Sequence, residues 1–181
     1  MVNGLAYNQE FLKCINEVMK AKHTVPVLNS SELKNLEQIG QGTSARVFKA
    51  VWFHETVAVK KLRNSVQDSM STMVHEMAEE INLLSQLSSP NIVRFYGTTE
   101  ELGIVMEFMV YGTLTNVVQN PPQRNGRPLT TMDYVRLALH AGCGMAYLHS
   151  CAVVHRDLNP NNIMVTDECG GLVAKLADFG L

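Results

Sequence analysis

The stretch VVHRDLNPNNIMV, residues 153–165, decides how the fold of this 181-residue chain is interpreted. It joins a long helical pattern to a short apolar run and holds Asp157 and Asn162 in a polar loop. Asp178 follows sixteen residues after Asn162, at the end of the next apolar run. An Asn and an Asp brought together across a small hairpin offer the oxygen ligands that Mg²⁺ prefers. The stretch therefore predicts a magnesium site carried by a helix, a loop and a hairpin.

The composition limits the classes of function. Hydrophobic residues make up 46% of the chain, enough for one domain with a real core, and the formal net charge is −2. Without an excess of basic residues, nucleic acid and anionic membranes are not expected as main partners. The 4 cysteines form no C-x-x-C pair and are interpreted as reduced thiols, and no apolar run approaches a membrane span. We expect a cytoplasmic protein.

Three changes of pattern predict the organisation of the chain. Residues 1–33 hold an amphipathic helix over Asn8–Lys22 and a proline-bearing linker. That helix is expected to pack against the following domain or to end a longer helical region, and binding to a partner or a membrane surface is the alternative. Residues 34–109 alternate between strand patterns and one helix, whereas residues 110–181 begin with helical patterns and end in a small hairpin.

The strands of the middle segment are short and rich in β-branched residues, with Gly or polar turns between them. The helix follows from apolar residues at helical spacing, among them Met77, Ile81 and Leu84. The expected strands lie in LEQIGQG (36–42), ARVFKAVWF (45–53), ETVAVKKL (55–62), NIVRFYG (91–97) and LGIVMEFM (102–109), and the helix in residues 69–87.

Two features of this segment point to a bound phosphate. The turn GQGTSARV, residues 40–47, is glycine-rich and lies between strands, so its backbone N–H groups can approach phosphate oxygens; an ordinary hairpin turn is the alternative. Lys60 lies in the apolar strand VAVK, where a lone ammonium is costly to bury. Glu80 on the predicted helix is the natural partner, and a strand-end lysine with its head in water is the alternative.

Taken together, these motifs resemble those of the eukaryotic protein kinases. The segment 155–162 matches H-R-D-L-x-x-x-N without a gap, and the resemblance covers Leu36–Leu181. It implies an α+β, two-lobed protein kinase-like fold with a complete amino-terminal lobe, made of a five-stranded antiparallel sheet and one helix, and a partial helical carboxy-terminal lobe. The stretches SSPNIVRFYG, IVMEFMVYGTL and GMAYLHS are similar to those of the tyrosine-kinase-like group of serine/threonine kinases.

The resemblance also implies a role for individual residues in ATP-dependent phosphoryl transfer to protein Ser or Thr hydroxyls. Asp157 would be the base, Lys60 would steady the phosphates while Glu80 holds it in place, and Asn162 and Asp178 would hold Mg²⁺. His155 and Phe179 are expected to be packing residues. The residues expected around ATP are Ile39, Gly40, Gly42, Val47, Ala58, Lys60, Met106, Glu107, Met109 and Met164.

Three departures from the family pattern leave alternatives open. Ala45 stands at the third glycine of the loop, which costs little if φ stays negative. Asn159 replaces a lysine that contacts the γ-phosphate, which removes a charge worth roughly 10²-fold and blurs the hydroxyl specificity. The chain stops at Leu181, before an activation segment. We expect either the front part of a longer kinase or a short form that binds nucleotide or a partner without transfer; an unrelated glycine-rich domain is a third alternative.

Overall fold

The computed structural model describes residues 25–42, 45–62, 70–100, 103–123, 126–168 and 170–179. The helix predicted over Asn8–Lys22 lies outside these residues. The described chain forms two compact units. The first holds the residues up to Leu87 together with Phe95–Phe108, and the second holds Ser88–Arg94 and the residues from Met109 onward. No helix among the described residues is long and apolar enough to cross a membrane.

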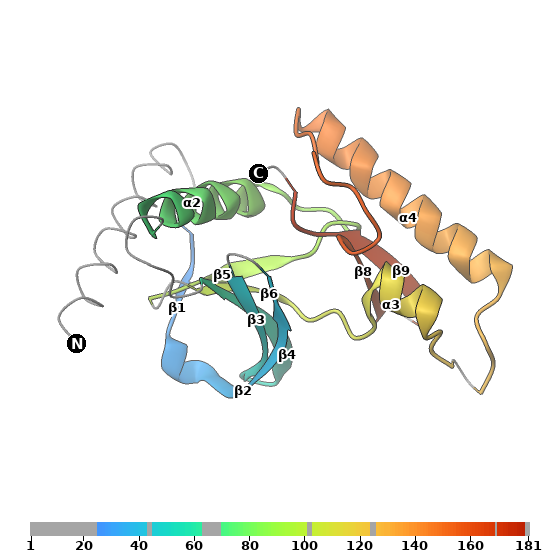
Figure 1. Ribbon diagram of the computed structural model, residues 1–181, viewed down its shortest axis with the longest axis horizontal. Helices are drawn as coiled ribbons and strands as arrows, with labels where there is room; N and C mark the ends of the chain where they lie inside the picture. Colours follow the sequence, from blue (N-terminus) through green and yellow to red (C-terminus); the bar gives the residue numbers. More distant parts are fainter. Residues whose placement is uncertain are drawn as a thin grey trace. The chain divides into compact units, whose positions relative to one another are not determined.

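The first unit is built on a six-stranded sheet in the order β1-β5-β6-β4-β3-β2 (Figure 1). The five antiparallel strands expected from the sequence are present as β2 to β6. A short 3₁₀ helix, Ser30–Glu32, precedes β2. The strands are β1 (Val27–Leu28), β2 (Leu33–Gln41), β3 (Ala45–Trp52), β4 (Glu55–Leu62), β5 (Phe95–Thr99) and β6 (Gly103–Glu107).

The sixth strand, β1, falls where the sequence indicated only a linker. It pairs in parallel with β5, Val27 opposite Thr98, and the Thr98 N–H donates to the Pro26 carbonyl at 2.9 Å. Gly97 makes this approach possible, because a Cβ there would lie 2.5 Å from the Pro26 oxygen and its φ is +154°. Two residues of pairing give no periodic pattern, so the strand could not be predicted.

The alternation of β4 divides its side chains between the two faces of the sheet. Val57 and Val59 are fully buried in a cluster with Val105 on one face. Ala58 and Lys60 therefore point to the opposite face. The helix α2 (Met70–Gln86) packs on the unit beside β5, and it buries Met77, Ile81 and Leu84 as predicted (Figure 1).

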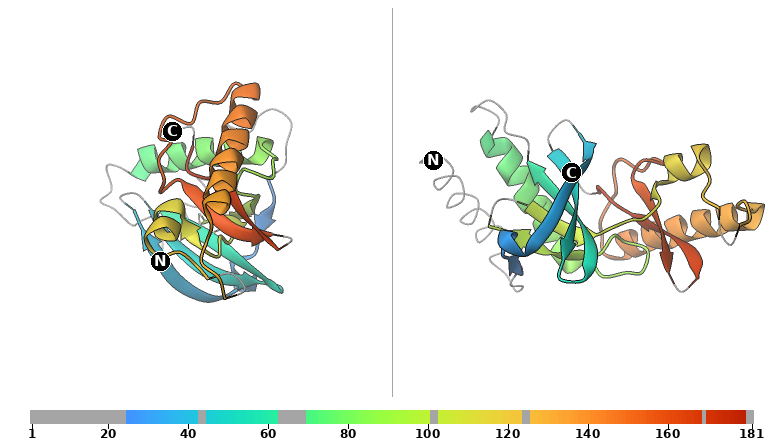
Figure 2. Two further views of the ribbon diagram at one scale, coloured as in Figure 1. Left: turned by 90° about the vertical axis from the view of Figure 1, so that its right-hand side faces the viewer. Right: turned by 90° about the horizontal axis from the view of Figure 1, so that it is seen from below.

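The second unit combines two helices with a three-stranded sheet in the order β7-β8-β9. Its long helix packs along β9 (Figure 2) and begins with a capping box, in which Thr130 and Asp133 bond each other's backbone N–H. The predicted helices and hairpin are confirmed. The elements are β7 (Gly112–Thr113), α3 (Leu114–Gln119), α4 (Thr131–Ser150), β8 (Ile163–Glu168) and β9 (Gly171–Leu176).

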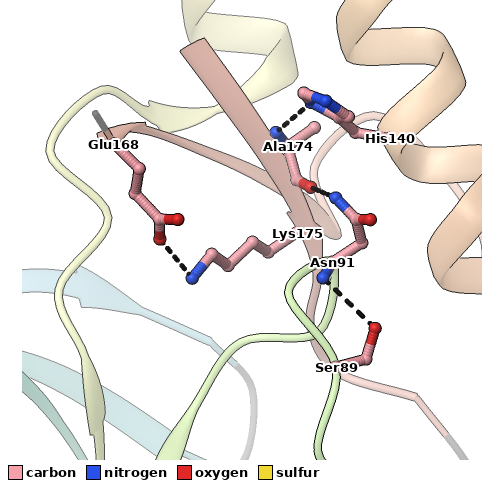
Figure 3. A network of polar contacts seen from close by, with 6 residues as sticks. All are labelled: Ser89, Asn91, His140, Glu168, Ala174 and Lys175. Carbon is pink, nitrogen blue, oxygen red and sulfur yellow. Dashed lines mark hydrogen bonds and ion pairs between the residues drawn. The ribbon is translucent and has the colours of Figure 1, made fainter. Parts of the chain in front are cut away.

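The open edge of β9 is covered by the segment Ser88–Arg94. The Leu176 N–H donates to the Asn91 carbonyl at 2.9 Å, and the Val93 N–H donates to the Leu176 carbonyl at 3.0 Å. Two side chains bond the backbone of Ala174 on the same edge (Figure 3). Asn91 Nδ2 donates to the Ala174 carbonyl at 3.0 Å, and the Ala174 N–H donates to His140 Nδ1 at 3.4 Å. The backbone groups of an exposed sheet edge are thereby satisfied.

Two glycines of α4 give a matched test of this packing. A Cβ on Gly144 would lie 2.7 Å from the Asn91 carbonyl oxygen, whereas a Cβ on Gly142 would meet nothing within 4 Å. We expect Gly144→Ala to lower the free energy of unfolding by about 1–3 kcal/mol through overpacking. Gly142→Ala should raise it by roughly 0.5–1 kcal/mol, because Ala is the better helix former. Urea unfolding followed by circular dichroism measures both, and equal effects would contradict the close contact.

Candidate active site

The glycine-rich turn closes the hairpin between β2 and β3. The Gly42 N–H donates to the Ala45 carbonyl at 2.8 Å, and Gly40 pairs with Val47. Neither glycine has the positive φ that favours glycine, and among the described residues a Cβ on either would make only ordinary contacts at 3.6 Å. The fold itself therefore does not require glycine at these two positions.

Register brings several of the predicted residues onto one face of the first sheet. Val47 lies opposite Lys60, and Ala58 lies opposite Met106. Directly opposed residues of antiparallel strands share a face, and so do residues two apart on one strand. Val47, Ala58, Lys60 and Met106 thus form one surface of the first unit, away from the buried Val59.

Lys60 and Glu80 form a close ion pair within this unit. The Lys60 ammonium donates to both oxygens of Glu80, at 2.7 Å to Oε1 and 2.9 Å to Oε2. The two side chains are only 17% and 8% exposed. Charge-assisted hydrogen bonds of this length hold the lysine head in one position, and they offset the cost of burying each charge.

Asp157 lies in a loop of the second unit whose backbone is unusual. The Asp157 N–H donates to the His155 carbonyl at 2.8 Å, which makes a three-residue turn centred on Arg156. Arg156 has a φ of +64°, a strained value for a residue other than glycine. Backbone strain of this kind gathers at functional sites when neighbouring contacts hold it in place.

Two asparagine amides hold Asp157. Asn162 Nδ2 donates to Asp157 Oδ2 at 2.9 Å and to its backbone carbonyl at 2.9 Å. Asn159 Nδ2 donates to Asp157 Oδ1 at 3.0 Å and to the same carbonyl at 3.2 Å. The carboxylate is nevertheless exposed to solvent, so both oxygens keep lone pairs for a further donor.

Asp178 follows β9 and is linked to the same loop. The N–H of the preceding Ala177 donates to the Asn162 carbonyl at 2.9 Å. Asp178 is exposed and has a φ of +51°, while the next residue, Phe179, is buried against the ring of His155 with centroids 5.9 Å apart. The Asp178 side chain is thus exposed to solvent, whereas that of Phe179 is buried. His155 and Phe179 pack together, as expected.

The donor set of this loop fits a hard divalent cation. Both hydrogens of the Asn162 amide face Asp157, so its amide oxygen is directed away from that contact. Asp178 adds an exposed carboxylate. Within the described part of the chain no three His, Cys, Asp or Glu side chains gather into a metal-binding group. Asn162 and Asp178 would supply one oxygen each, which suits an ion that is also held by a phosphate ligand.

The remaining predicted residues are distributed over both units. Ile39 is exposed on β2, and Glu107 ends β6 opposite Val57. In the second unit, the buried Met109 accepts the Gly112 N–H at its carbonyl, at 3.0 Å, and Met164 lies on β8.

Sequence reasoning missed three residues that shape the second unit. Asn91 and His140 carry no motif, because their roles depend on contacts distant in sequence. Asn159 was interpreted only as a missing lysine, although the structure turns its amide onto Asp157. A signal was present for Asn159, since Asn side chains often bond backbone groups two residues away.

Comparison with known proteins identifies the family of the chain. The family model described as protein tyrosine and serine/threonine kinase matches residues 33–181. A probable serine/threonine-protein kinase of Dictyostelium discoideum, drkC, is 34% identical over 170 residues, covering 90% of this chain and 21% of that protein. The probable serine/threonine-protein kinase SIS8 of Arabidopsis thaliana is 37% identical over 150 residues, covering 80% of this chain and 14% of that protein.

A third relative is covered over a larger share of its own length but is less similar. The serine/threonine/tyrosine-protein kinase HT1 of Arabidopsis thaliana is 30% identical over 169 residues, covering 91% of this chain and 42% of that protein. The chain therefore spans less than half the length of each of these three relatives. The family model covers most of the chain, and its matched region includes both the Lys60–Glu80 pair and the Asp157 loop. The chain belongs to the protein tyrosine and serine/threonine kinase family.

Proposed function

We propose that this chain carries the nucleotide and catalytic-loop residues of an enzyme that transfers a phosphoryl group from Mg-ATP to Ser or Thr hydroxyls of proteins. Membership in the kinase family implies ATP and a divalent metal ion. The observation that carries the proposal is Asp157, a solvent-exposed carboxylate held at both oxygens by neutral amides. Such a group can accept a hydrogen bond from a substrate hydroxyl in a fixed direction.

Roles in binding follow from the surface on the first sheet. Lys60, held by Glu80, would bind phosphate oxygens as a point charge. Gly40 and Gly42 would let backbone N–H groups approach the phosphates, because no side chain stands there. Adenine would contact Val47 and Ala58 on this surface, with Met106 behind it and backbone groups of Glu107 at its edge. Met109 and Met164 belong to the second unit, and we assign them to adenine on the resemblance alone. Ile39 would cover the outer side.

Roles in the chemical step belong to the loop. Asn162 and Asp178 would hold Mg²⁺, which neutralises charge on the phosphates when bound. Asp157 would orient the attacking hydroxyl and take up its proton, an effect worth roughly 10²–10⁴-fold. Positioning and charge neutralisation account for the rest of the rate, and no covalent enzyme intermediate is needed.

Finer assignments rest on the sequence motifs. We place the chain in the tyrosine-kinase-like group of serine/threonine kinases, on the strength of the stretches around Asn91, Met106 and Tyr147. A cytoplasmic location and a partner for residues 8–22 remain predictions.

A second function is favoured by one observation on α4. The side chains of Met132, Val135 and Leu139 lie three or four residues apart, and they are 62%, 53% and 63% exposed. An exposed apolar stripe marks a surface that another chain or segment can cover. This supports the alternative that the chain binds nucleotide or a partner without phosphoryl transfer.

A single-turnover assay with γ-labelled ATP separates the two functions. The labelled phosphate is followed onto a generic protein acceptor, using both the 181-residue chain and the protein in the form in which its source cells make it. Transfer by either supports the proposed function. Binding of Mg-ATP without transfer by both would support the second one.

Replacement of Lys60 tests the phosphate contact. We expect Lys60→Met to lower the transfer rate by roughly 10²–10³-fold, as the loss of a preorganised charge does at other sites. The matched control is Lys61→Met, because Lys61 is the next residue on β4 and points to the other face of the sheet. If both variants lost the same activity, the assignment of Lys60 would be wrong.

A further inference from the structure

We propose that Asn159 is a positioning residue for Asp157, and that it acts through Asp157 rather than on the transferred phosphate. This inference rests on the proposed function, in which Asp157 receives the substrate proton. The family pattern places a phosphate-contacting lysine at this position. In this chain an amide stands there, and it is turned toward the carboxylate at 3.0 Å.

The two oxygens of Asp157 are held by different amides. Asn159 Nδ2 bonds Oδ1 at 3.0 Å, and Asn162 Nδ2 bonds Oδ2 at 2.9 Å. One donor would leave the carboxylate free to rotate about its Cβ–Cγ bond. Two donors on opposite oxygens fix the plane of the group, and with it the direction of the lone pairs that a substrate hydroxyl meets.

The Asn159 amide is itself held in one orientation. Its oxygen accepts the N–H of Asn161 at 2.9 Å, while its nitrogen donates to the Asp157 carboxylate and carbonyl. A flipped amide would place two oxygens against each other at Asp157 and leave the Asn161 N–H facing an NH₂ group. The backbone of Asn159 also contributes, because its carbonyl accepts the Asn162 N–H at 3.0 Å. One loop thus supplies the donors for both oxygens of the Asp157 carboxylate.

Two consequences follow from this arrangement. The amide nitrogen of Asn159 donates to the carbonyl and the carboxylate of Asp157, and its side chain is neutral, so this residue does not replace the charge of a lysine. The orientation of Asp157 is set by neutral donors, and it should therefore depend little on ionic strength. A lysine at this position would remove the contact to Oδ1 and add a mobile charge in its place.

The kinetic test uses variants of the protein in the form in which its source cells make it. Asn159→Ala removes both N–H donors without adding a charge, and we expect kcat to fall roughly tenfold to a hundredfold with the KM for ATP within about twofold. Asn159→Lys should also lower kcat. The matched control is Asn161→Ala, because the Asn161 side chain bonds Thr115 at 2.7 Å and does not touch Asp157, and its backbone N–H is retained.

Two kinetic outcomes would overturn the inference. One is an Asn159→Ala variant with the parent kcat. The other is an Asn159→Lys variant faster than the parent, since that would show that Asn159 affects the rate only through the absence of the lysine charge. Loss of ATP affinity together with kcat would also count against a positioning role, because it would place Asn159 at the nucleotide.

A second measurement does not depend on catalysis. In the 181-residue chain with ¹⁵N-labelled asparagine, Asp157→Ala should shift the side-chain amide signals of Asn159 and Asn162 and leave that of Asn161 unchanged. If the side-chain amide signal of Asn159 did not shift, its hydrogen bond to Asp157 would be ruled out. A parent protein that transfers no phosphate would overturn the proposed function instead, while this spectrum would still decide whether Asn159 holds Asp157.

Discussion

Replacing Asp157 by alanine should lower the single-turnover rate of phosphoryl transfer by roughly 10²–10⁴-fold while leaving Mg-ATP binding within about twofold of the parent. The variant removes the proposed acceptor for the substrate proton. It leaves the proposed nucleotide contacts of Lys60 in place. Asp157 is exposed, and the amides of Asn159 and Asn162 can bond water in its absence, so the fold should be retained. Rapid-quench kinetics and a fluorescent nucleotide titration measure the two effects.

Asp167→Ala is the matched control for this variant. Asp167 is an exposed aspartate of the same unit, near the far end of β8 from the catalytic loop. The control should transfer phosphate at the parent rate. An Asp157→Ala protein that kept its rate would remove the base from the proposed mechanism, and one that lost nucleotide affinity would move Asp157 into the binding site.

Replacing Asp178 should abolish the use of Mg-ATP, because the proposed metal site would lose its charged protein ligand. Alanine is expected to bring a second defect. Asp178 has a φ of +51°, a region that Asn and Asp tolerate better than alanine, so Asp178→Ala would also cost about 1 kcal/mol of stability. Asp178→Asn avoids this cost and changes only the charge.

The measurement is ATP affinity as a function of magnesium concentration. The parent should bind ATP more tightly as Mg²⁺ rises, and Asp178→Asn should show a loss of at least about tenfold in the Mg²⁺-dependent part, since a bound cation is worth several kcal/mol to phosphate charge. Asp167→Asn serves as the control. If Asp178→Asn bound Mg-ATP as tightly as the parent, the metal assignment would fail.

Local patterns predicted the parts of the fold that depend on local physics. The helix α4 and the β8–β9 hairpin follow from apolar periodicity and from the turn residues between them. The contact between Lys60 and Glu80 follows from the cost of burying one charge without the other. Each of these inferences needed only neighbouring residues or one strong energetic constraint.

The parts that escaped prediction depend on contacts between distant segments. Strand β1 exists because Gly97 admits the carbonyl of Pro26, and no period marks a strand of two residues. The edge contacts of Asn91 and His140 join residues 34 or more positions apart in sequence. At Asn159 a family pattern supplied the expectation of a lost charge, whereas the bond to Asp157 is a property of this chain's own loop.

The path of Ser88–Arg94 has a consequence for how this protein can be dissected. The chain leaves the first unit after Leu87, returns at Phe95 and leaves again after Phe108, so neither unit is one uninterrupted piece of the polypeptide. A gene split between Phe108 and Met109 would give the first product the buried Ile92 and Val93 without the strand they cover, and the second product a β9 with a bare edge. We therefore expect the two fragments to fold when they are joined in one chain, or when they are mixed and bind each other.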